Sequence, residues 1–218
     1  MGGLIPLGDA SRRPRGFPAI TILIIVVNAY VFLLELSGGN RFVHTWSAVP
    51  IRITHGHHVI TIFTSMFMHA SWMHIIGNMI FLWAFGPAIE DAMGHFRFLV
   101  FYLAGGVIAM TAQIMGAPHS AIPTLGASGA IAAVMGAFIV TYPRDRIRTL
   151  LIIFIFIRVT FIPAVFLIGF WFLIQVLDYG VVARVQTGGV AYLAHIGGFV
   201  FGVITARLFE NPQRVASR

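Results

Sequence analysis

Four polar residues stand in apolar segments of this sequence, and together they could carry out acyl transfer. Ser128 lies in the run Leu-Gly-Ala-Ser-Gly-Ala, His195 lies in the run Ala-His-Ile-Gly-Gly, and His74 and Asn78 are four residues apart. Polar groups are costly in hydrocarbon, so those that persist there usually line a bundle interior or a water-filled cavity. A hydroxyl, an imidazole and two donors for an oxyanion are the groups that acyl transfer needs. The pattern predicts a serine hydrolase built inside a membrane.

The composition is that of a membrane protein. The chain has 218 residues, 58% hydrophobic and 10% charged, with a mean hydropathy of +0.90. Soluble domains carry about a quarter charged residues, so we expect a single polytopic membrane domain. The absence of Cys and Lys excludes disulfides, thiolate metal sites, a cysteine nucleophile and Ser–Lys chemistry. The net charge of +7 comes from arginines dispersed around the hydrophobic segments, so nucleic acid is not the expected partner.

The long apolar runs predict an all-α polytopic membrane protein, a bundle of six transmembrane helices between two cytoplasmic tails. A run of about 20 apolar residues is long enough to cross a bilayer. Two apolar runs are too short to cross: Val59–Met68 is expected to be an interfacial or re-entrant piece, and Leu150–Ile157 to lie along the membrane interface, with a seventh span there as the less favoured alternative. The expected tails are residues 1–16 and 210–218, and the expected spans are about 17–36, 72–89, 96–115, 125–142, 160–177 and 189–209.

The distribution of arginines indicates the orientation of these spans. With the N-terminus inside, the inner loops and tails hold 11 arginines, and the outer loops hold 3, namely Arg41, Arg52 and Arg184. The positive-inside rule then places both termini in the cytoplasm. The second, fourth and sixth spans start outside, so all four polar residues fall in the outer third of the bilayer. We expect an integral, multi-pass protein of the cell (inner) membrane of a prokaryote.

Each polar residue has an expected role. Ser128 would be the nucleophile, and His195 the general base that takes its proton and returns it to the leaving amine. We expect no Asp or Glu in the outer parts of the other spans, which favours a dyad over a triad. The oxyanion would be bound by the Ser128 backbone N–H at a helix N-terminus, by the side chains of Asn78 and His74, and, as a further candidate, at Gly126. The residue two places after the serine is Ala, so the Gly-x-Ser-x-Gly motif of soluble hydrolases is not matched.

Small residues beside the nucleophile and base predict that their helices pack closely. Gly129 follows Ser128 directly, and Gly198 and Gly202 have Gly-x-x-x-Gly spacing after His195. Such residues let the backbones of two membrane helices approach each other. A serine and a histidine on different helices need that approach to form a hydrogen bond.

Three motifs, in this order along the chain, resemble those of the rhomboid family of intramembrane serine proteases: His74-x-x-x-Asn78, Gly126-x-Ser128-Gly129 and Ala194-His195-x-x-Gly198-x-x-x-Gly202. The similarity extends over about Thr61 to Leu208. It implies a six-helix core, cleavage of transmembrane segments near their outer end by a Ser–His dyad, and an oxyanion site at His74 and Asn78. Glu90 matches a position that stabilises the family's fold, and its other interpretation is an inner-loop acid that caps a helix end.

The sequence also departs from the family pattern. Many members carry a Trp-Arg pair in the first loop, whereas here Trp46 is followed by Ser47. Some members carry a Tyr that stacks on the catalytic His, and here that position is Ala132. The way in which His195 is oriented is therefore open at this point.

Two other functions compete with proteolysis. One is a catalytically silent rhomboid-like protein that binds membrane clients, and the intact polar residues argue against it. The other is a small transporter with a histidine proton relay, for which the inner halves of the spans lack paired ionisable groups. His55, His57 and His58 could bind a metal or sense pH, but no Cys or nearby acid accompanies them. We expect no cofactor and no metal, and the expected partners are transmembrane protein substrates and the lipid bilayer.

Overall fold

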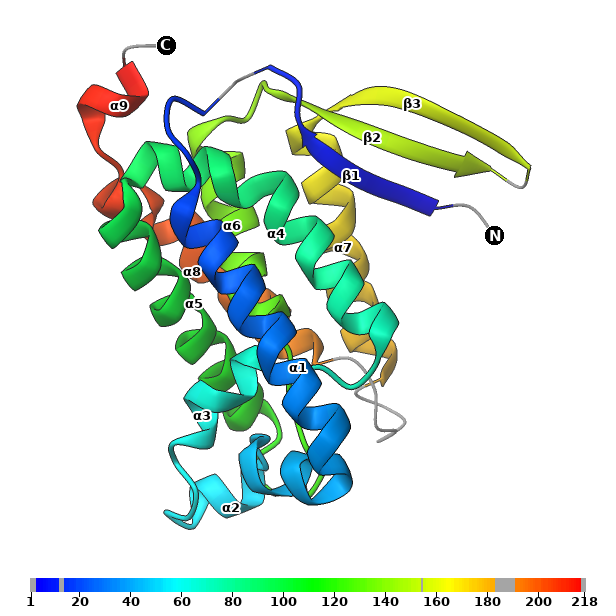
Figure 1. The fold of residues 1–218 in the computed structure, drawn as a ribbon, viewed down its shortest axis with the longest axis vertical. Coiled ribbons are helices and arrows are strands. Elements are labelled where there is room, and N and C mark those ends of the chain that lie inside the picture. Colours follow the sequence, from blue (N-terminus) through cyan, green and yellow to red (C-terminus); the bar gives the residue numbers. More distant parts are fainter. Residues whose placement is uncertain (1–2, 12–13, 154, 183–190, 217–218) are drawn as a thin grey trace.

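A helical bundle forms most of the computed structural model, which describes residues 3–11, 14–153, 155–182 and 191–216 (Figure 1). Four of its helices are long and apolar enough to cross a membrane, and two apolar helices are shorter. The protein is therefore an integral, multi-pass membrane protein. The four long helices are α1 (Ala19–Trp46), α4 (Trp72–Met93), α5 (His95–Gly116) and α8 (Tyr192–Phe209), and the two shorter apolar stretches are α6 (Ser128–Thr141) and residues 164–180 of α7 (Ala164–Val182).

Most helices begin within a few residues of the spans expected from the apolar runs. α1 is the longest, because it continues past the expected end at residue 36 to Trp46, with a kink at Gly39 (φ 55°). α6 is shorter than expected, since residues 125–127 are not helical. The expected start of the sixth span, at residue 189, lies outside the described residues.

The connection between α1 and α4 contains short helical turns. They are α2 (Pro50–Thr54), α3 (Thr61–Thr64) and the 3-10 helix η1 (Ser65–Phe67). Ala48 and Thr124 exchange two backbone hydrogen bonds of 3.0 and 2.7 Å, which tie this connection to the segment that leads into α6. The connection therefore helps to position the residues just before Ser128.

The structure is mostly helical, as predicted, but the all-α prediction missed a three-stranded antiparallel sheet in the order β1-β2-β3. The strands are β1 (Gly3–Asp9), β2 (Arg146–Ile153) and β3 (Phe156–Pro163). The expected interfacial run at 150–157 belongs to this hairpin, and the expected fifth span loses residues 160–163 to β3. The Ile, Val, Thr and Phe side chains of β2 and β3 favour strands. The first strand lies more than 130 residues away in the expected N-terminal tail, so no local pattern indicates the pairing.

α6 lies at the centre of the bundle, with residues 129–138 all buried. It packs against α4, α5 and α8. A methyl group added at Gly198 would lie 2.1 Å from the Gly129 carbonyl oxygen, and one added at Gly202 would lie 2.0 Å from the Ala133 carbonyl oxygen. The α6 and α8 backbones therefore touch at positions that only glycine can occupy.

Glu90 lies inside α4, so its expected place in an inner loop is wrong. The side chain is 2% exposed and accepts hydrogen bonds from the Ile20 and Thr21 backbone N–H groups at 2.9 and 2.8 Å and from the Thr21 hydroxyl at 2.6 Å. His95 Nδ1 is 2.6 Å from the same carboxylate. Glu90 thus caps the first turn of α1 from a neighbouring helix, where a negative charge also suits the helix dipole.

Candidate active site

Ser128 and His195 meet where two helices begin. Ser128 is the first residue of α6, and His195 lies in the first turn of α8. The Ser128 hydroxyl and His195 Nε2 are 2.7 Å apart, a hydrogen-bond distance. The close packing of α6 on α8 allows this contact. The structure therefore brings together the expected nucleophile and the expected base.

His195 has a second partner that sequence reasoning missed, the side chain of Gln175 on α7. Its Oε1 is 2.6 Å from His195 Nδ1, and both residues are buried. The Gln175 amide nitrogen donates to the Trp171 carbonyl at 3.4 Å, so the amide oxygen is the atom that faces the imidazole. An oxygen acceptor requires a proton on Nδ1, which leaves Nε2 free to accept the Ser128 proton. Gln175 thus selects the tautomer that a general base needs.

Trp171 packs on the same imidazole from one turn earlier in α7. The two rings are 5.7 Å apart between centroids and inclined by 37°. Ala132, which stands where some family members carry a stacking Tyr, is fully buried in α6. Trp171 and Gln175 are spaced i, i+4 and lie on one helix face. A lone Gln in the apolar run 164–177 was the available signal for this face.

The expectation that no acid lies in the outer part of another span is wrong. Glu35 is buried in α1 and accepts a 2.8 Å hydrogen bond from the His69 backbone N–H. Its carboxylate therefore holds the chain just before α4, and no hydrogen bond between it and His195 is found among the described residues. Glu35 was overlooked because it stands at the last position but one of the expected first span.

His74 and Asn78 present donors from the N-terminal half of α4. Ser71 caps this helix by accepting the His74 backbone N–H at 3.2 Å. His74 Nδ1 accepts the Ala70 backbone N–H at 3.4 Å, so a neutral His74 carries its proton on Nε2. Asn78 is buried, and its side-chain nitrogen has no hydrogen-bond partner within the described part of the chain. A buried amide donor of this kind is open to an incoming oxygen.

Gly126 separates His74 from Ser128. Its φ is +136°, and a methyl group added there would lie 3.0 Å from His74 Nε2 and 3.6 Å from the Ser128 hydroxyl oxygen. The Gly126 backbone N–H donates to the Ser65 carbonyl at 2.9 Å, so η1 holds this loop in place. Glycine is required here because both the backbone conformation and the available space exclude a side chain.

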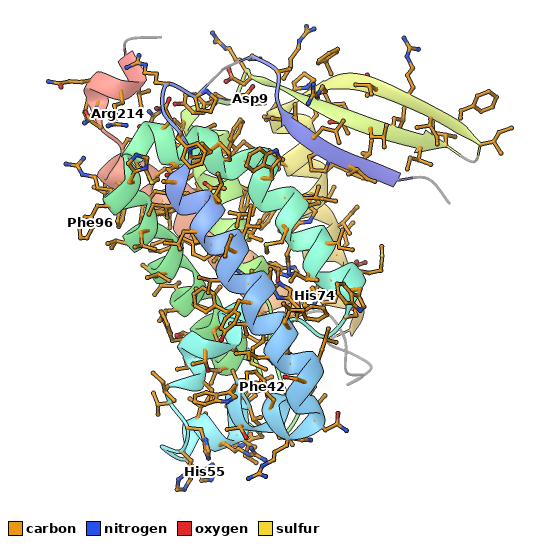
Figure 2. All side chains as sticks on the ribbon, in the orientation of Figure 1. Asp9, Phe42, His55, His74, Phe96 and Arg214 are labelled. Atoms are coloured by element: carbon orange, nitrogen blue, oxygen red, sulfur yellow. The ribbon has the colours of Figure 1, made fainter. Side chains whose placement is uncertain are left out.

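A small cavity is lined by Ser128, though not by His74, Asn78 or His195. A larger cavity of about 310 Å³ lies at the other end of the bundle, where Arg214 is found (Figure 2). It adjoins none of the four polar residues. We therefore place the chemistry at the small cavity, which is lined by Met66, Gly106, Ala109, Met110, Thr124, Leu125, Gly126, Ser128, Gly129, Ala130, Ala191 and Ala194.

Four other histidines that the sequence brings near the site or groups together are also placed by the structure. His69 is buried beside His74, with ring centroids 5.1 Å apart. His55, His57 and His58 are exposed in the connection between α1 and α4, and His55 marks the end of the molecule opposite Arg214 (Figure 2). Within the described ranges, no group of three or more His, Asp or Glu side chains could hold a metal ion.

Comparison with known proteins identifies the family. The rhomboid domain matches residues 56–211. The chain belongs to the rhomboid family. The resemblance inferred from the sequence motifs is therefore confirmed.

Relatives of this rhomboid come from bacteria and from mitochondria. It is 29% identical over 216 residues to rhomboid protease GluP of Bacillus subtilis, covering 94% of this chain and 38% of that protein. It is 30% identical over 151 residues to the mitochondrial rhomboid protein 1 of Saccharomyces cerevisiae, covering 66% and 40% of the two chains. It is 30% identical over 147 residues to the human mitochondrial presenilin-associated rhomboid-like protein, covering 64% and 35%. This rhomboid thus spans less than half of the length of these curated relatives.

Proposed function

We propose that this rhomboid is an intramembrane serine endopeptidase that cleaves transmembrane segments of membrane proteins near their outer end. The observation that carries the proposal is the hydrogen-bonded series from the Gln175 amide oxygen through the His195 imidazole to the Ser128 hydroxyl, with distances of 2.6 and 2.7 Å. A nucleophile, a base within reach of it and a third group that orients the base are the geometric signature of covalent acyl transfer.

The chemistry follows from this geometry. The Ser128 oxygen attacks the scissile carbonyl carbon while its proton passes to His195 Nε2. The resulting imidazolium keeps its Nδ1–H on the Gln175 oxygen. His195 then gives the proton to the departing amine, and the peptide bond breaks to leave an acyl ester on Ser128. Water attacks this ester with His195 again as base, which releases the acid and restores the serine.

The negative oxygen of each tetrahedral intermediate has donors around it. The first N–H groups of α6 have no intrahelical acceptor, and the backbone N–H of Ser128 is among them. The proposed donors from α4 are the unpartnered Asn78 amide nitrogen and the protonated Nε2 of His74. Gly126 keeps the space between them open. Fixed donors in a buried site stabilise charge in the transition state more than water does.

The proposed topology has six spans and both termini in the cytoplasm of a prokaryotic cell. At ~1.5 Å per residue, the 14 residues of α6 cover roughly 21 Å, less than the ~30 Å thickness of the hydrocarbon layer. Surrounded by longer helices, α6 can begin below the outer surface, which supports a submerged, water-accessible Ser128. Because the relatives include both bacterial and mitochondrial proteins, direct localisation of the protein is the test of the proposed prokaryotic membrane.

The alternative function is a silent protein that binds membrane clients, and labelling with a fluorophosphonate probe separates the two. We expect the wild type in detergent or liposomes to react with the probe and to cleave a single-span substrate. Ser128→Ala should lose both activities, and His195→Ala should lower both by several orders of magnitude. Cleavage that survives Ser128→Ala would overturn the proposal, and an unlabelled but folded wild type would favour the client-binding alternative.

A further inference from the structure

The β2–β3 hairpin exposes an apolar tip at the end of the bundle that carries the C-terminus and α9 (Pro212–Ala216). Figure 1 shows the sheet projecting sideways past α7 at that end. We define the hairpin tip as Ile153, Ile155, Phe156 and Ile157. Ile155, Phe156 and Ile157 are 86, 73 and 67% exposed. Exposure of adjoining large apolar side chains to this extent marks an interaction surface in a folded protein.

All charged side chains of the hairpin are positive. Its three charged residues are Arg146, Arg148 and Arg158, all exposed, and the segment 146–163 contains no Asp or Glu. Arg148 pairs with Phe161, and Arg158 pairs with Leu151. Directly paired residues lie on the same face of a sheet, so each face combines arginine with large apolar side chains. This combination suits the boundary between anionic headgroups and acyl chains.

The neighbouring helix extends the same surface. α7 begins directly after β3 and contacts both strands of the hairpin. Its Phe166, Phe170 and Leu173 are 69, 55 and 51% exposed. An apolar helix with such side chains on its outer face in an integral membrane protein faces lipid. The apolar surface of the hairpin tip therefore adjoins a surface that is already in lipid.

Backbone hydrogen bonding limits how deep the hairpin can go. β3 is an edge strand of the sheet, so one row of its backbone N–H and C=O groups has no partner strand. Unpaired backbone groups do not occur in the hydrocarbon layer because no water is there to bond them. The interfacial region offers both headgroup and water partners.

From these observations we propose that the β2–β3 hairpin is a membrane-interface anchor: its backbone stays in the interfacial region, the apolar side chains of its tip reach the acyl chains, and Arg146, Arg148 and Arg158 bind anionic phospholipid headgroups. The partner is the bilayer that the helices themselves cross. The hairpin has no acidic residue and exposes six large apolar side chains, which fit this partner better than they fit water: Ile153, Ile155, Phe156, Ile157, Val159 and Phe161.

The natural absence of cysteine permits a direct test. Ile155→Cys, labelled with an environment-sensitive fluorophore, is reconstituted as the full chain in liposomes of phosphatidylcholine and phosphatidylglycerol. The matched control is Gln213→Cys on exposed α9, at the same end of the bundle. We expect nitroxide-labelled lipid to quench the label at 155 several-fold more than the label at 213, and aqueous iodide to do the opposite. Equal quenching of both labels by iodide would overturn the anchor.

The role of the arginines is tested in the same samples. The double substitution Arg148→Gln with Arg158→Gln should lower lipid quenching at 155 several-fold in liposomes that contain phosphatidylglycerol. Arg41→Gln, an exposed arginine near Phe42 at the opposite end (Figure 2), should leave it unchanged. Equal quenching in the double variant and in the wild type would overturn headgroup binding.

A second copy of the chain is the competing occupant, because edge strands can pair with each other. Oxidation of the unlabelled Ile155→Cys variant at increasing dilution in lipid distinguishes the two. We expect disulfide-linked dimers to decline with dilution toward the level of the Gln213→Cys control. A high yield that persists on dilution would show that protein covers the tip, and would overturn the lipid assignment.

Discussion

His195 is held at both ring nitrogens, and the Gln175 contact is where the site can be tested most sharply. A hydrogen bond to a charged group contributes ~1.5–3 kcal/mol, and the imidazole becomes charged only during the reaction. Gln175→Leu should therefore lower kcat by about 10- to 100-fold, since ~1.4 kcal/mol is a factor of ten. KM should change little, because Gln175 contacts the base and does not line the cavity beside Ser128.

Two further variants separate orientation from packing at this position. Gln175→Glu keeps an oxygen acceptor for Nδ1 and should restore most of kcat. Gln113→Leu is the matched control, because Gln113 also lies beside α8 but accepts the Ala194 backbone N–H at 3.3 Å. Steady-state kinetics on a fluorogenic transmembrane substrate provide the measurement. If Gln175→Glu is as impaired as Gln175→Leu, Gln175 serves packing alone.

At the scale of single residues, spacing along the sequence was enough to select Ser128, His195, His74 and Asn78, because each is a polar group in an apolar run. Gln175 escaped this reasoning although it stands in similar surroundings. Its role depends on Gln175 on α7 lying at the same depth in the bundle as His195 on α8. No sequence pattern within α7 predicts that alignment. The same holds for Trp171, which lies one turn before Gln175 on α7.

At the scale of elements, the contact between α6 and α8 sets the distance between Ser128 and His195. Gly202→Ala would place a methyl group 2.0 Å from the Ala133 carbonyl oxygen. The helices must move apart, and we expect a loss of roughly 1–3 kcal/mol in the free energy of unfolding. Probe labelling of Ser128 should slow as well, because the same movement lengthens its hydrogen bond to His195.

Gly77→Ala is the matched control for this substitution. Gly77 also lies within a helix, α4, but a methyl group added there meets nothing within 4 Å. Alanine is a better helix former than glycine by up to ~1 kcal/mol, so stability should be unchanged or slightly higher. Unfolding midpoints in mild detergent compare the two variants. Equal stability of Gly202→Ala and Gly77→Ala would show that the α6–α8 contact is loose.

The elements differed in how well the sequence predicted them. Long apolar runs predicted α4, α5 and α8 to within a few residues, because length and hydropathy decide a helix in a membrane. β2 and β3 read as one short apolar run, since both faces of the hairpin are apolar and the alternation typical of strands is lost. The partner strand β1 adds a contact between the two halves of the sequence that only the folded chain reveals.

At the scale of the whole molecule, buried ionisable groups link folding to pH. His69 lies in the connection between η1 and α4 and is 2% exposed. Burial, reinforced by the charge of His74 and opposed by the Phe67 carbonyl, lowers the pKa of His69 to about 3. The unfolded chain binds a proton at this residue below about pH 6.5. The contribution of neutral, buried His69 to the free energy of unfolding is therefore fully present above pH 6.5. It is lost as the pH drops toward 3, by up to ~1.4 kcal/mol per pH unit.

His69→Phe tests this link, because it keeps a buried ring and removes the titration. The His69 backbone N–H that binds Glu35 is unaffected by the substitution. The ionisable neighbours Glu35 and His74 also stay in place. Denaturant titrations between pH 8 and 4 should show a shallower loss of stability in His69→Phe than in the wild type. His57→Phe, at an exposed histidine in the same connection, should retain the wild-type slope. Identical slopes in all three proteins would mean that acid acts elsewhere in the bundle. A shallower slope in His69→Phe alone would place part of the acid sensitivity of the fold in the short segment that sets His74 beside Ser128.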